Sequence, residues 1–207
     1  MIEPNIKPTK DGPFKVTGVS RMITSKGEDR EVTDPMLLCR CGHSGNKPYC
    51  DGSHVKAGFS GDKSENRVPD RLKEYMGEEI TINDNRGVCS HAGHCTNNLP
   101  QVFRIGKRPW IDADAAKPDE IMTVIKTCPS GALSYTKDGK KDVDFFERDP
   151  LIKIWRDGPL ATVGGIRIEG HEPQTKEHCT LCRCGASSNK PFCDGAHHRV
   201  RFRDDKN

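Results

Sequence analysis

The chain has 207 residues, of which 33% are hydrophobic and 30% are charged, and its formal net charge at neutral pH is +3. So low an apolar content excludes one large hydrophobic core and favours several small units, which commonly need a metal to stabilise them. The net charge is too small and too dispersed to indicate binding to nucleic acid or to an anionic membrane surface.

No feature of the sequence indicates secretion or membrane insertion. The first residues, MIEPNIKPTKDGPF, lack the apolar region of a secretory signal, and no apolar run reaches the roughly 20 residues of a membrane span. The chain contains ten cysteines. Because thiols that serve as ligands must stay reduced, we expect a cytoplasmic protein without membrane contact.

The N-terminal region predicts a small β unit. We expect a polar arm over residues 1–11, and then a strand in GPFKVTGVSRMI, where Phe14, Val16 and Val19 alternate with polar residues. A charged turn over residues 25–35 follows, and the apolar triplet 36–38 leads into a cysteine-rich stretch.

That stretch, CRCGHSGNKPYCDGSH at residues 39–54, recurs as CRCGASSNKPFCDGAH at residues 182–197. The two copies align without a gap, and each offers three thiols and one imidazole in register. Such donors suit zinc or an iron–sulfur cluster. Zinc sites usually take thiols from Cys-x2-Cys or Cys-x4-Cys pairs, whereas a Cys-x-Cys pair on a short extended segment suits one iron of a two-iron cluster.

The end of each stretch predicts a short helix. Asp51 is expected to be its N-cap, so that Cys50 precedes the helix and His54 lies one turn into it. The thiolate and imidazole would then lie together at a positive helix terminus, which favours an anionic cluster. We expect this helix to end at Gly58 and Phe59 to return to the core.

The pattern Cys-x-Cys-x2-Ser-x3-Pro-x-Cys-Asp-Gly-[Ser/Ala]-His resembles the signature of the CDGSH iron–sulfur domain of the mitoNEET-like family. The resemblance implies one [2Fe–2S] cluster per motif, held by three cysteines and one histidine. The implied metal ligands are Cys39, Cys41, Cys50, His54, Cys182, Cys184, Cys193 and His197. The alternative is a pair of zinc-like turns or plain core cysteines.

Other residues of the motif are candidates for contacts around the cluster. Hydroxyls and backbone amides can hydrogen-bond the sulfides, and carboxylates can brace the loop. These candidates are Ser44, Lys47, Asp51, Gly52, Ser187, Lys190, Asp194 and Gly195.

The repeat extends beyond the ligands. Gly158-Pro159 precedes LATVGGIRIEG much as Gly12-Pro13 precedes the first strand, and Phe202 follows its motif as Phe59 follows the first. The tail, RVRFRDD, alternates as a strand with a solvated basic face would. Because single-motif members of the family pair as two-fold dimers, we expect the two lobes to pair within this one chain.

A different unit lies between the repeats. In PDEIMTVIKTC, from residue 118, Pro118 at the start and Ile121, Val124 and Ile125 on one face predict a helix that ends at Cys128-Pro129. The order of features in this unit is a cysteine cluster, then the helix, then the Cys-Pro pair. This order resembles that of a single-cluster bacterial ferredoxin and, more closely, that of the divergent ferredoxin-like domain that accompanies some CDGSH motifs.

The middle unit departs from the ferredoxin pattern. Its thiols are Cys89, Cys95 and Cys128, and Ala92 stands where a [4Fe–4S] site would have its middle cysteine. Three thiolates match a [3Fe–4S] cluster, which we favour. The alternatives are a spacer without a cluster and a [4Fe–4S] cluster completed by His91 or His94, which we interpret rather as loop residues.

One cysteine remains outside these ligand sets. Cys179 lies three residues before Cys182, but Met36 holds the equivalent place in the first copy, so we interpret Cys179 as a small buried apolar residue.

The sequence therefore predicts an α+β protein in which two small β-rich CDGSH lobes, residues 1–69 and 141–207, flank a ferredoxin-like α+β unit, residues 70–140. Two classes of function remain open: one-electron transfer or redox sensing with a redox partner protein, and storage or transfer of clusters to an apo iron–sulfur acceptor. Imidazole ligation should raise the potential above that of all-cysteine ferredoxins, couple reduction to protonation, and make the histidines the acid-labile ligands. With no nucleotide-binding loop, flavin fingerprint or catalytic triad in the sequence, we expect a carrier and not an enzyme.

Overall fold

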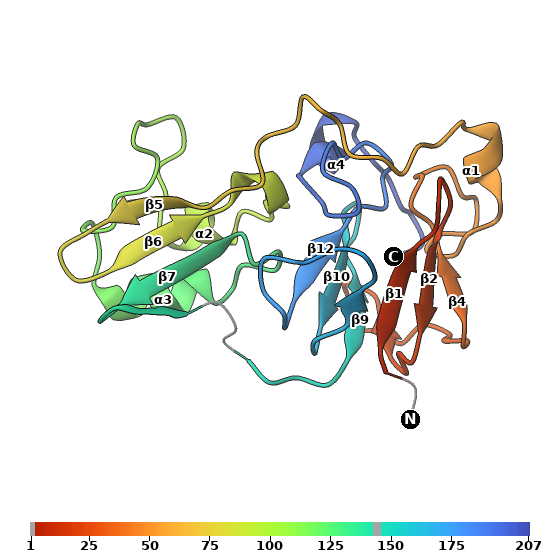
Figure 1. The fold of residues 1–207 in the computed structure, drawn as a ribbon, viewed down its shortest axis with the longest axis horizontal. Helices are drawn as coiled ribbons and strands as arrows, with labels where there is room; N and C mark the ends of the chain where they lie inside the picture. The colour runs from red at the N-terminus through yellow and green to blue at the C-terminus, as the bar shows by residue number, and fades with distance from the viewer. Residues whose placement is uncertain (1–2, 143–145) are drawn as a thin grey trace.

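The computed structural model describes residues 3–142 and 146–207. It shows an α+β protein with three four-stranded sheets and short helices, which confirms the predicted fold class. Two of the sheets lie side by side, and the third, from the middle unit, stands at one side of them (Figure 1). In the described parts of the chain, no helix has the length and apolar character needed to cross a membrane.

The first two sheets are built from equivalent strands of the two repeats. The order of the first is β11-β1-β2-β4, and that of the second is β12-β10-β9-β3. Their bounds are Asn5–Pro8 (β1), Phe14–Thr17 (β2), Met22–Ile23 (β3), Met36–Leu38 (β4), Leu151–Ile154 (β9), Leu160–Val163 (β10), Arg167–Ile168 (β11) and Cys179–Leu181 (β12).

Each repeat gives one strand to the sheet of the other. β11, from the second repeat, pairs in parallel with β1, where Ile6 lies opposite Ile168. β3, from the first repeat, pairs in parallel with β9, where Met22 lies opposite Ile152. All four side chains belong to one continuous buried cluster. The repeats therefore share a core, while the domain boundaries at 69/70 and 140/141 stay predictions.

The expectation of a polar arm over residues 1–11 is wrong, because the strand β1 occupies Asn5–Pro8 within it. Ile6 is 1% exposed and faces the shared core, and the strand pairs with β2 on one edge and β11 on the other. A strand of four residues with one buried apolar side chain gives too little alternation to be recognised in the sequence.

The two segments that follow the motifs also differ from expectation. Phe59 is only half-buried and lies under the guanidinium of Arg40, 5.4 Å from its ring centroid. The tail is not a strand: α4 (Ala196–Arg199) ends at Arg199, and Phe202 and Asp204 are buried beyond it. What fixes the tail is a buried charge pair, which residue alternation cannot reveal.

The middle unit has its own sheet and core. Its elements are β5 (Lys73–Met76), β6 (Thr81–Asp84), β7 (Leu133–Lys137), β8 (Lys140–Asp142), the 3-10 helix η1 (Arg86–Val88), α2 (His94–Asn98) and α3 (Pro118–Ile125). The predicted helix is confirmed as α3, which has Pro118 in its first turn and Ile121 and Ile125 fully buried. The carboxylate of Glu120 accepts from the Lys117 backbone N–H at 3.1 Å, which fixes the start of the helix.

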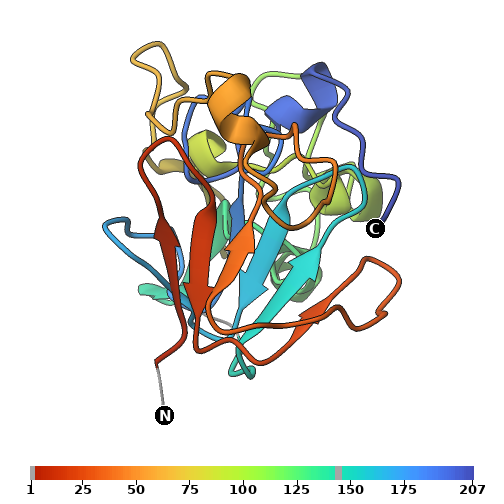
Figure 2. The same ribbon diagram turned by 90° about the vertical axis from the view of Figure 1, so that its right-hand side faces the viewer.

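Both cluster loops lie at the same end of the paired sheets. α1 (Ser53–Lys56) and α4, which end the two loops, stand together at the top in Figure 2, and the N-terminus is at the opposite end. The strand exchange therefore brings all eight candidate CDGSH ligands to one edge of the shared core.

We predict that removing the charge of Asp204 destabilises the whole chain. Asp204 pairs with Arg183, and each side chain is 1% exposed. Burial opposes ionisation of Asp204, but Arg183 and Asn207 outweigh it and keep its pKa low, so the pair stabilises the fold above the unfolded-state pKa and is lost as acid protonates Asp204. Asp204→Asn leaves the guanidinium buried and unpaired and should lower the free energy of unfolding by about 3 kcal/mol.

Chemical denaturation at neutral pH measures this effect. The control is Asp205→Asn, which makes the same change at the exposed neighbouring residue and should change stability by less than about 0.5 kcal/mol. Equal losses in the two variants would contradict the role assigned to the buried pair.

Candidate metal centres

The two cysteine-rich loops fold in the same way. Each is closed by two backbone hydrogen bonds: the N–H of Cys39 donates to Pro48 O at 2.8 Å, and that of Cys50 donates to Leu37 O at 2.9 Å. The equivalent bonds at Cys182 and Cys193 have the same lengths. Because the ligands sit at both ends of this closure, β4 and β12 place their thiols at the mouth of each loop.

The candidate ligands of each loop lie in two close pairs. The Sγ atoms of Cys39 and Cys41 are 3.7 Å apart, as are those of Cys182 and Cys184. The other pair is a thiol and a histidine Nδ1, separated by 3.4 Å from Cys50 to His54 and by 3.5 Å from Cys193 to His197. In the described residues these are pairs, and no group of three or more metal-ligating side chains surrounds one point.

The helix that follows each loop begins one residue later than expected. The N-cap of α1 is Gly52, with φ at 86°, and not Asp51, since the turn from Cys50 into the helix needs a left-handed residue. The carboxylate of Asp51 instead accepts from the N–H groups of Ser53 and Gly45, at 3.0 and 2.8 Å, and braces the loop. These hydrogen bonds, led by Ser53, lower the pKa of Asp51.

Asp194 makes the matching contacts in the second loop. Its carboxylate accepts from the N–H groups of Ala196 and Ser188, at 3.0 and 2.8 Å. The backbone N–H of Gly195 donates to Cys193 Sγ at 3.4 Å, and that of Gly52 donates to Cys50 Sγ at the same distance. These glycines thus support the thiolates through their main chain.

The serines and lysines of the motif contact protein groups of the loops and of the other repeat. The hydroxyls of Ser44 and Ser187 donate to the carbonyl oxygens of Tyr49 and Phe192, both at 2.7 Å, so their protons serve the loop and not a sulfide. Each lysine reaches the other repeat: Lys47 Nζ lies 5.8 Å from the ring centroid of Phe202, and Lys190 Nζ lies 5.9 Å from that of Phe59. Lys47 Nζ also donates to Ser44 O at 2.8 Å.

The two loops touch each other directly. Cys41 and Cys184 form an isolated antiparallel bridge, and both following glycines have positive φ. A Cβ at Gly42 would lie 2.7 Å from Cys184 O, and one at Gly185 would lie 2.4 Å from Cys41 O. Glycine is therefore required at both positions by backbone conformation and by the close approach of the chains.

The arginines between the ligands also act across this contact. Burial lowers the pKa of both guanidinium groups, and a thiolate of the other loop acts in the opposite direction, Cys182 on Arg40 and Cys39 on Arg183. Both arginines are buried, at 4% and 2% exposure. Each arginine is therefore held inside its own repeat and within electrostatic range of a candidate ligand of the other loop.

The middle unit makes the two loops inequivalent. Cys50 and His54 are partly exposed, whereas Cys193 and His197 are buried, at 2% and 6% exposure. The ring of His91 lies against the second loop, where a Cβ on Gly195 would be 2.8 Å from it. Burial lowers the pKa of His197 to about 4, and the nearby charges of His198 and His91 act in the same direction.

Further hydrogen bonds join the middle unit to the second repeat. His198 Nε2 lies 3.3 Å from His91 O, and His178 Nε2 lies 3.1 Å from Cys128 O. Asn189 Nδ2 donates to Gly87 O at 2.8 Å. Such contacts leave no pattern in a single sequence, and the sequence analysis missed them.

The three thiols of the middle unit line one cavity, although they are not gathered around one point. Cys89, Cys95 and Cys128 line a space of about 650 Å³, and so does Ala92, which has no donor atom. Burial raises the pKa of Cys89 to about 12 and also raises that of Cys95, and the charge of Cys128 acts in the same direction on both thiols.

The two loop histidines also line this cavity, but each has another partner. His91 Nε2 lies 3.3 Å from a guanidinium nitrogen of Arg86, and the ring of His94 packs against Trp155 at 5.6 Å.

Cys179 is confirmed as a packing residue. It is 3% exposed in β12, its sulfur lies 3.2 Å from Thr162 Oγ1, and burial raises its pKa to about 12. Met36, at the start of β4, is 1% exposed.

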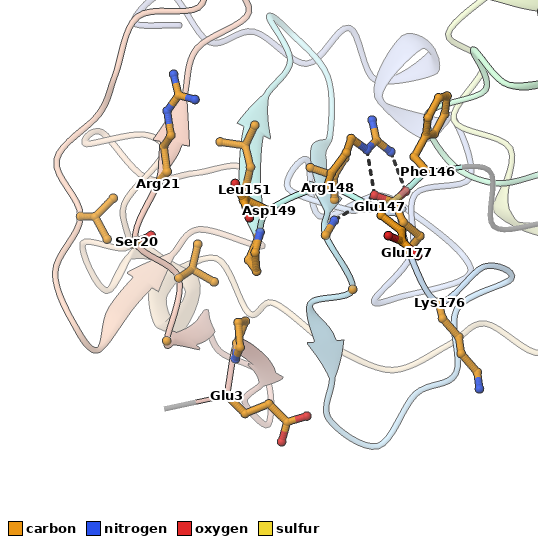
Figure 3. A pocket seen from close by; sticks show the side chains of 18 of the residues that line it. Glu3, Ser20, Arg21, Phe146, Glu147, Arg148, Asp149, Leu151, Lys176 and Glu177 are labelled. Atoms are coloured by element: carbon orange, nitrogen blue, oxygen red, sulfur yellow. Dashed lines mark hydrogen bonds and ion pairs between the residues drawn. The ribbon is translucent and has the colours of Figure 1, made fainter. Parts of the chain in front are cut away.

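A larger cavity, of about 1690 Å³, lies away from the thiols. Figure 3 shows Arg148 paired with Glu177 at its wall, with N–O distances of 2.6 and 2.8 Å. Among the described residues that line it there is no cysteine or histidine, so it offers no soft metal ligand.

Comparisons with known proteins bear on these sites. A family model described as an iron-binding zinc finger of the CDGSH type matches residues 11–55 and 157–198, and one described as a divergent 4Fe-4S mono-cluster domain matches residues 75–138. The uncharacterized protein YjdI of Escherichia coli (strain K12) is 39% identical over 61 residues, which are 30% of this chain and 80% of YjdI. YjdI of Escherichia coli O157:H7 matches to the same extent. No solved structure is significantly similar to the chain.

The fold, the paired thiol and imidazole ligands and these matches define an iron–sulfur protein. The chain belongs to the CDGSH iron-binding family, and carries two CDGSH domains on either side of a divergent 4Fe-4S mono-cluster domain.

We predict that the contact between the two loops tolerates no side chain. Gly185→Ala places a Cβ against Cys41 O and also strains a residue with φ at 77°. Gly139→Ala is the matched control, because its φ is 73° but nothing lies within 4 Å of the added Cβ.

Both variants should lose about 1 kcal/mol to the positive φ, and only Gly185→Ala should also lose bound iron, measured per chain after purification. Equal iron contents in the two variants would show that the loops do not depend on this contact.

Proposed function

We propose that the chain is a one-electron carrier that holds a [2Fe–2S] cluster in each CDGSH loop and a [3Fe–4S] cluster at the middle cavity. The observation that carries this proposal is that the three ligand sets lie in a row. The first loop touches the second at Cys41 and Cys184, and the second touches the middle unit at Gly195 and His91. Three adjoining redox sites suit a relay, since electron transfer slows steeply with distance.

The spacing of the ligands supports two-iron clusters in the loops. With metal–sulfur bonds of about 2.3 Å and metal–nitrogen bonds of about 2.0 Å, tetrahedral geometry puts two sulfurs about 3.8 Å apart, and a sulfur and a nitrogen about 3.5 Å apart. The loop pairs, at 3.7 Å and at 3.4–3.5 Å, match both values. Each pair is thus arranged to hold one metal, and each loop has two pairs.

The donors of the middle cavity support a three-iron cluster. Three thiols line the cavity, and Ala92 offers no fourth donor. His91 and His94 line it too, but the contacts of one with Arg86 and of the other with Trp155 favour their interpretation as loop residues. Arg86 also lies 3.6 Å from Cys89 Sγ, where its charge would stabilise a bound anionic cluster.

The difference in burial gives the relay two distinct ends. The second loop lies between the other two sites, and its Cys193 and His197 are buried, while His54 of the first loop and the mouth of the middle cavity are partly exposed. Imidazole ligation should give the loop clusters higher potentials than all-cysteine ferredoxin clusters. We therefore expect a carrier and not an enzyme, working in the cytoplasm with a redox partner protein.

Cluster storage or transfer is the second candidate. It is favoured by one observation, the partial exposure of Cys50 and His54 in the first loop, where an acceptor could reach the ligands. Incubation of the loaded chain with an apo-ferredoxin tests it. Transfer of the [2Fe–2S] unit within minutes would favour this function, and no transfer in either redox state would exclude it.

Metal analysis and EPR test the proposed set of clusters. We expect about seven irons per chain, acid-labile sulfide, and an oxidised-state EPR signal of a three-iron cluster, with further signals on reduction. Four irons and a signal only on reduction would contradict the middle cluster. Zinc without sulfide would contradict the proposal as a whole.

The proposed order of the sites predicts unequal magnetic coupling. In the fully reduced chain, the [2Fe–2S] signal of the second loop should relax faster than that of the first, because among the described residues it is the second loop that contacts the middle unit. His54→Cys shifts the signal of the first loop and so assigns the two. Cys95→Ser, which removes a middle ligand, should abolish the difference, and equal relaxation in the unaltered chain would contradict the order.

A further inference from the structure

We propose that the mouth of the middle cavity is a docking surface for an acidic redox protein. This inference rests on the proposed electron-carrier function and names the kind of partner that the middle site receives. The surface consists of the outer lining residues of the cavity: Val68, Arg71, Lys73, Arg86, Arg104, Ile105 and Arg108.

The charges on this surface are of one sign. Five basic side chains, Arg71, Lys73, Arg86, Arg104 and Arg108, line the cavity. Among the described residues that line it the single carboxylate is Asp84, which is 1% exposed. The whole chain carries a net charge of only +3, so the mouth concentrates positive charge that the rest of the chain balances.

Three of these basic groups have side-chain partners inside the unit, one of which is Lys73, whose Nζ lies 4.9 Å from the centroid of the Tyr75 ring. Arg104 pairs with Asp112 at 2.7 Å, and Arg86 lies over the ring of Trp110, 4.7 Å from its centroid. Arg71, Lys73 and Arg108 are exposed and make no ion pair with a carboxylate in the part of the chain that the structure describes. Their charge is therefore available to carboxylates of a partner protein.

Apolar side chains accompany the exposed charges. Ile105 is 82% exposed and Val68 is 56% exposed, and both line the same mouth. Exposed apolar residues next to arginines are typical of protein interfaces, where the apolar groups exclude water and the charges guide association. A small anion would satisfy the charges but would leave these two side chains in water, so the surface favours an acidic protein.

The other open end of the chain lacks this character. Near His54, the ammonium of Lys10 is already paired with Asp11 and Asp62, at 3.4 and 3.2 Å. The surface at the first loop is therefore mixed in sign. The three thiols of the middle unit line the cavity beneath the basic mouth, so an acidic protein docked there comes close to the proposed middle cluster.

Charge reversal on the cluster-loaded chain tests the docking surface. The variant Arg71→Glu/Arg108→Glu is compared with Lys15→Glu/Lys26→Glu, which makes the same change in net charge at exposed lysines of the first repeat. The probe is an acidic flavodoxin, and a basic cytochrome c serves as the probe of opposite charge. The measurement is the dissociation constant at low and at high ionic strength.

We expect the unaltered chain to bind the flavodoxin more tightly than the cytochrome c and to lose this preference as salt is added. Binding of the flavodoxin should weaken at least tenfold in Arg71→Glu/Arg108→Glu and less than twofold in the lysine control. Equal weakening in the two variants, or no preference for the acidic probe, would overturn the docking surface.

A second readout separates this test from that of the proposed function. Carbodiimide coupling of the flavodoxin should form a bond at Lys73, which mass spectrometry locates, and this needs no electron transfer. Iron content and EPR of the same samples report whether the clusters are present. Coupling at Lys73 in a chain without a middle cluster would uphold the surface and refute the relay, and coupling elsewhere would refute the surface.

Discussion

The close contact between the two CDGSH loops is the constraint on which the rest of the structure depends. At Cys41 and Cys184 the backbones meet so closely that Gly42 and Gly185 can carry no side chain. The reciprocal exchange of β3 and β11 holds this contact in place, because it merges the two repeats into one core. Neither loop is therefore an independent unit, since each stands on a core to which the other repeat contributes a strand.

The middle unit breaks the symmetry that this exchange creates. It has its own core, but His91, Gly87 and Cys128 all contact the second repeat. As a result two loops with nearly the same sequence have different surroundings: one keeps its histidine partly exposed, and the other has it buried. The chain therefore has one ligand set in the middle and one at each end, an arrangement that two symmetry-related loops alone cannot provide.

The sequence predicts the parts of this protein that depend on local chemistry, and misses those that depend on distant contacts. The close pairs of candidate ligands in the two loops, α3 and the packing role of Cys179 all follow from spacing, residue type or repeat alignment. The strand in the N-terminal arm was missed because Ile6 is its single buried apolar residue, and one of its two pairing partners, β11, lies more than 150 residues away. The sequence suggests a hydrogen bond from the Ser44 hydroxyl to a cluster sulfide, because its actual acceptor, Tyr49 O, is apparent only once the loop is folded.

The central claim is that one chain arranges three iron–sulfur sites in a row, with the second CDGSH loop in the middle. Diffraction from crystals of the loaded chain at the iron absorption edge tests it most directly. The account predicts three anomalous peaks, one between each loop's ligand pairs and one among Cys89, Cys95 and Cys128, with the peak of the second loop lying between the other two. No peak at the middle cavity, or a middle peak nearer to the first loop than to the second, would contradict the account.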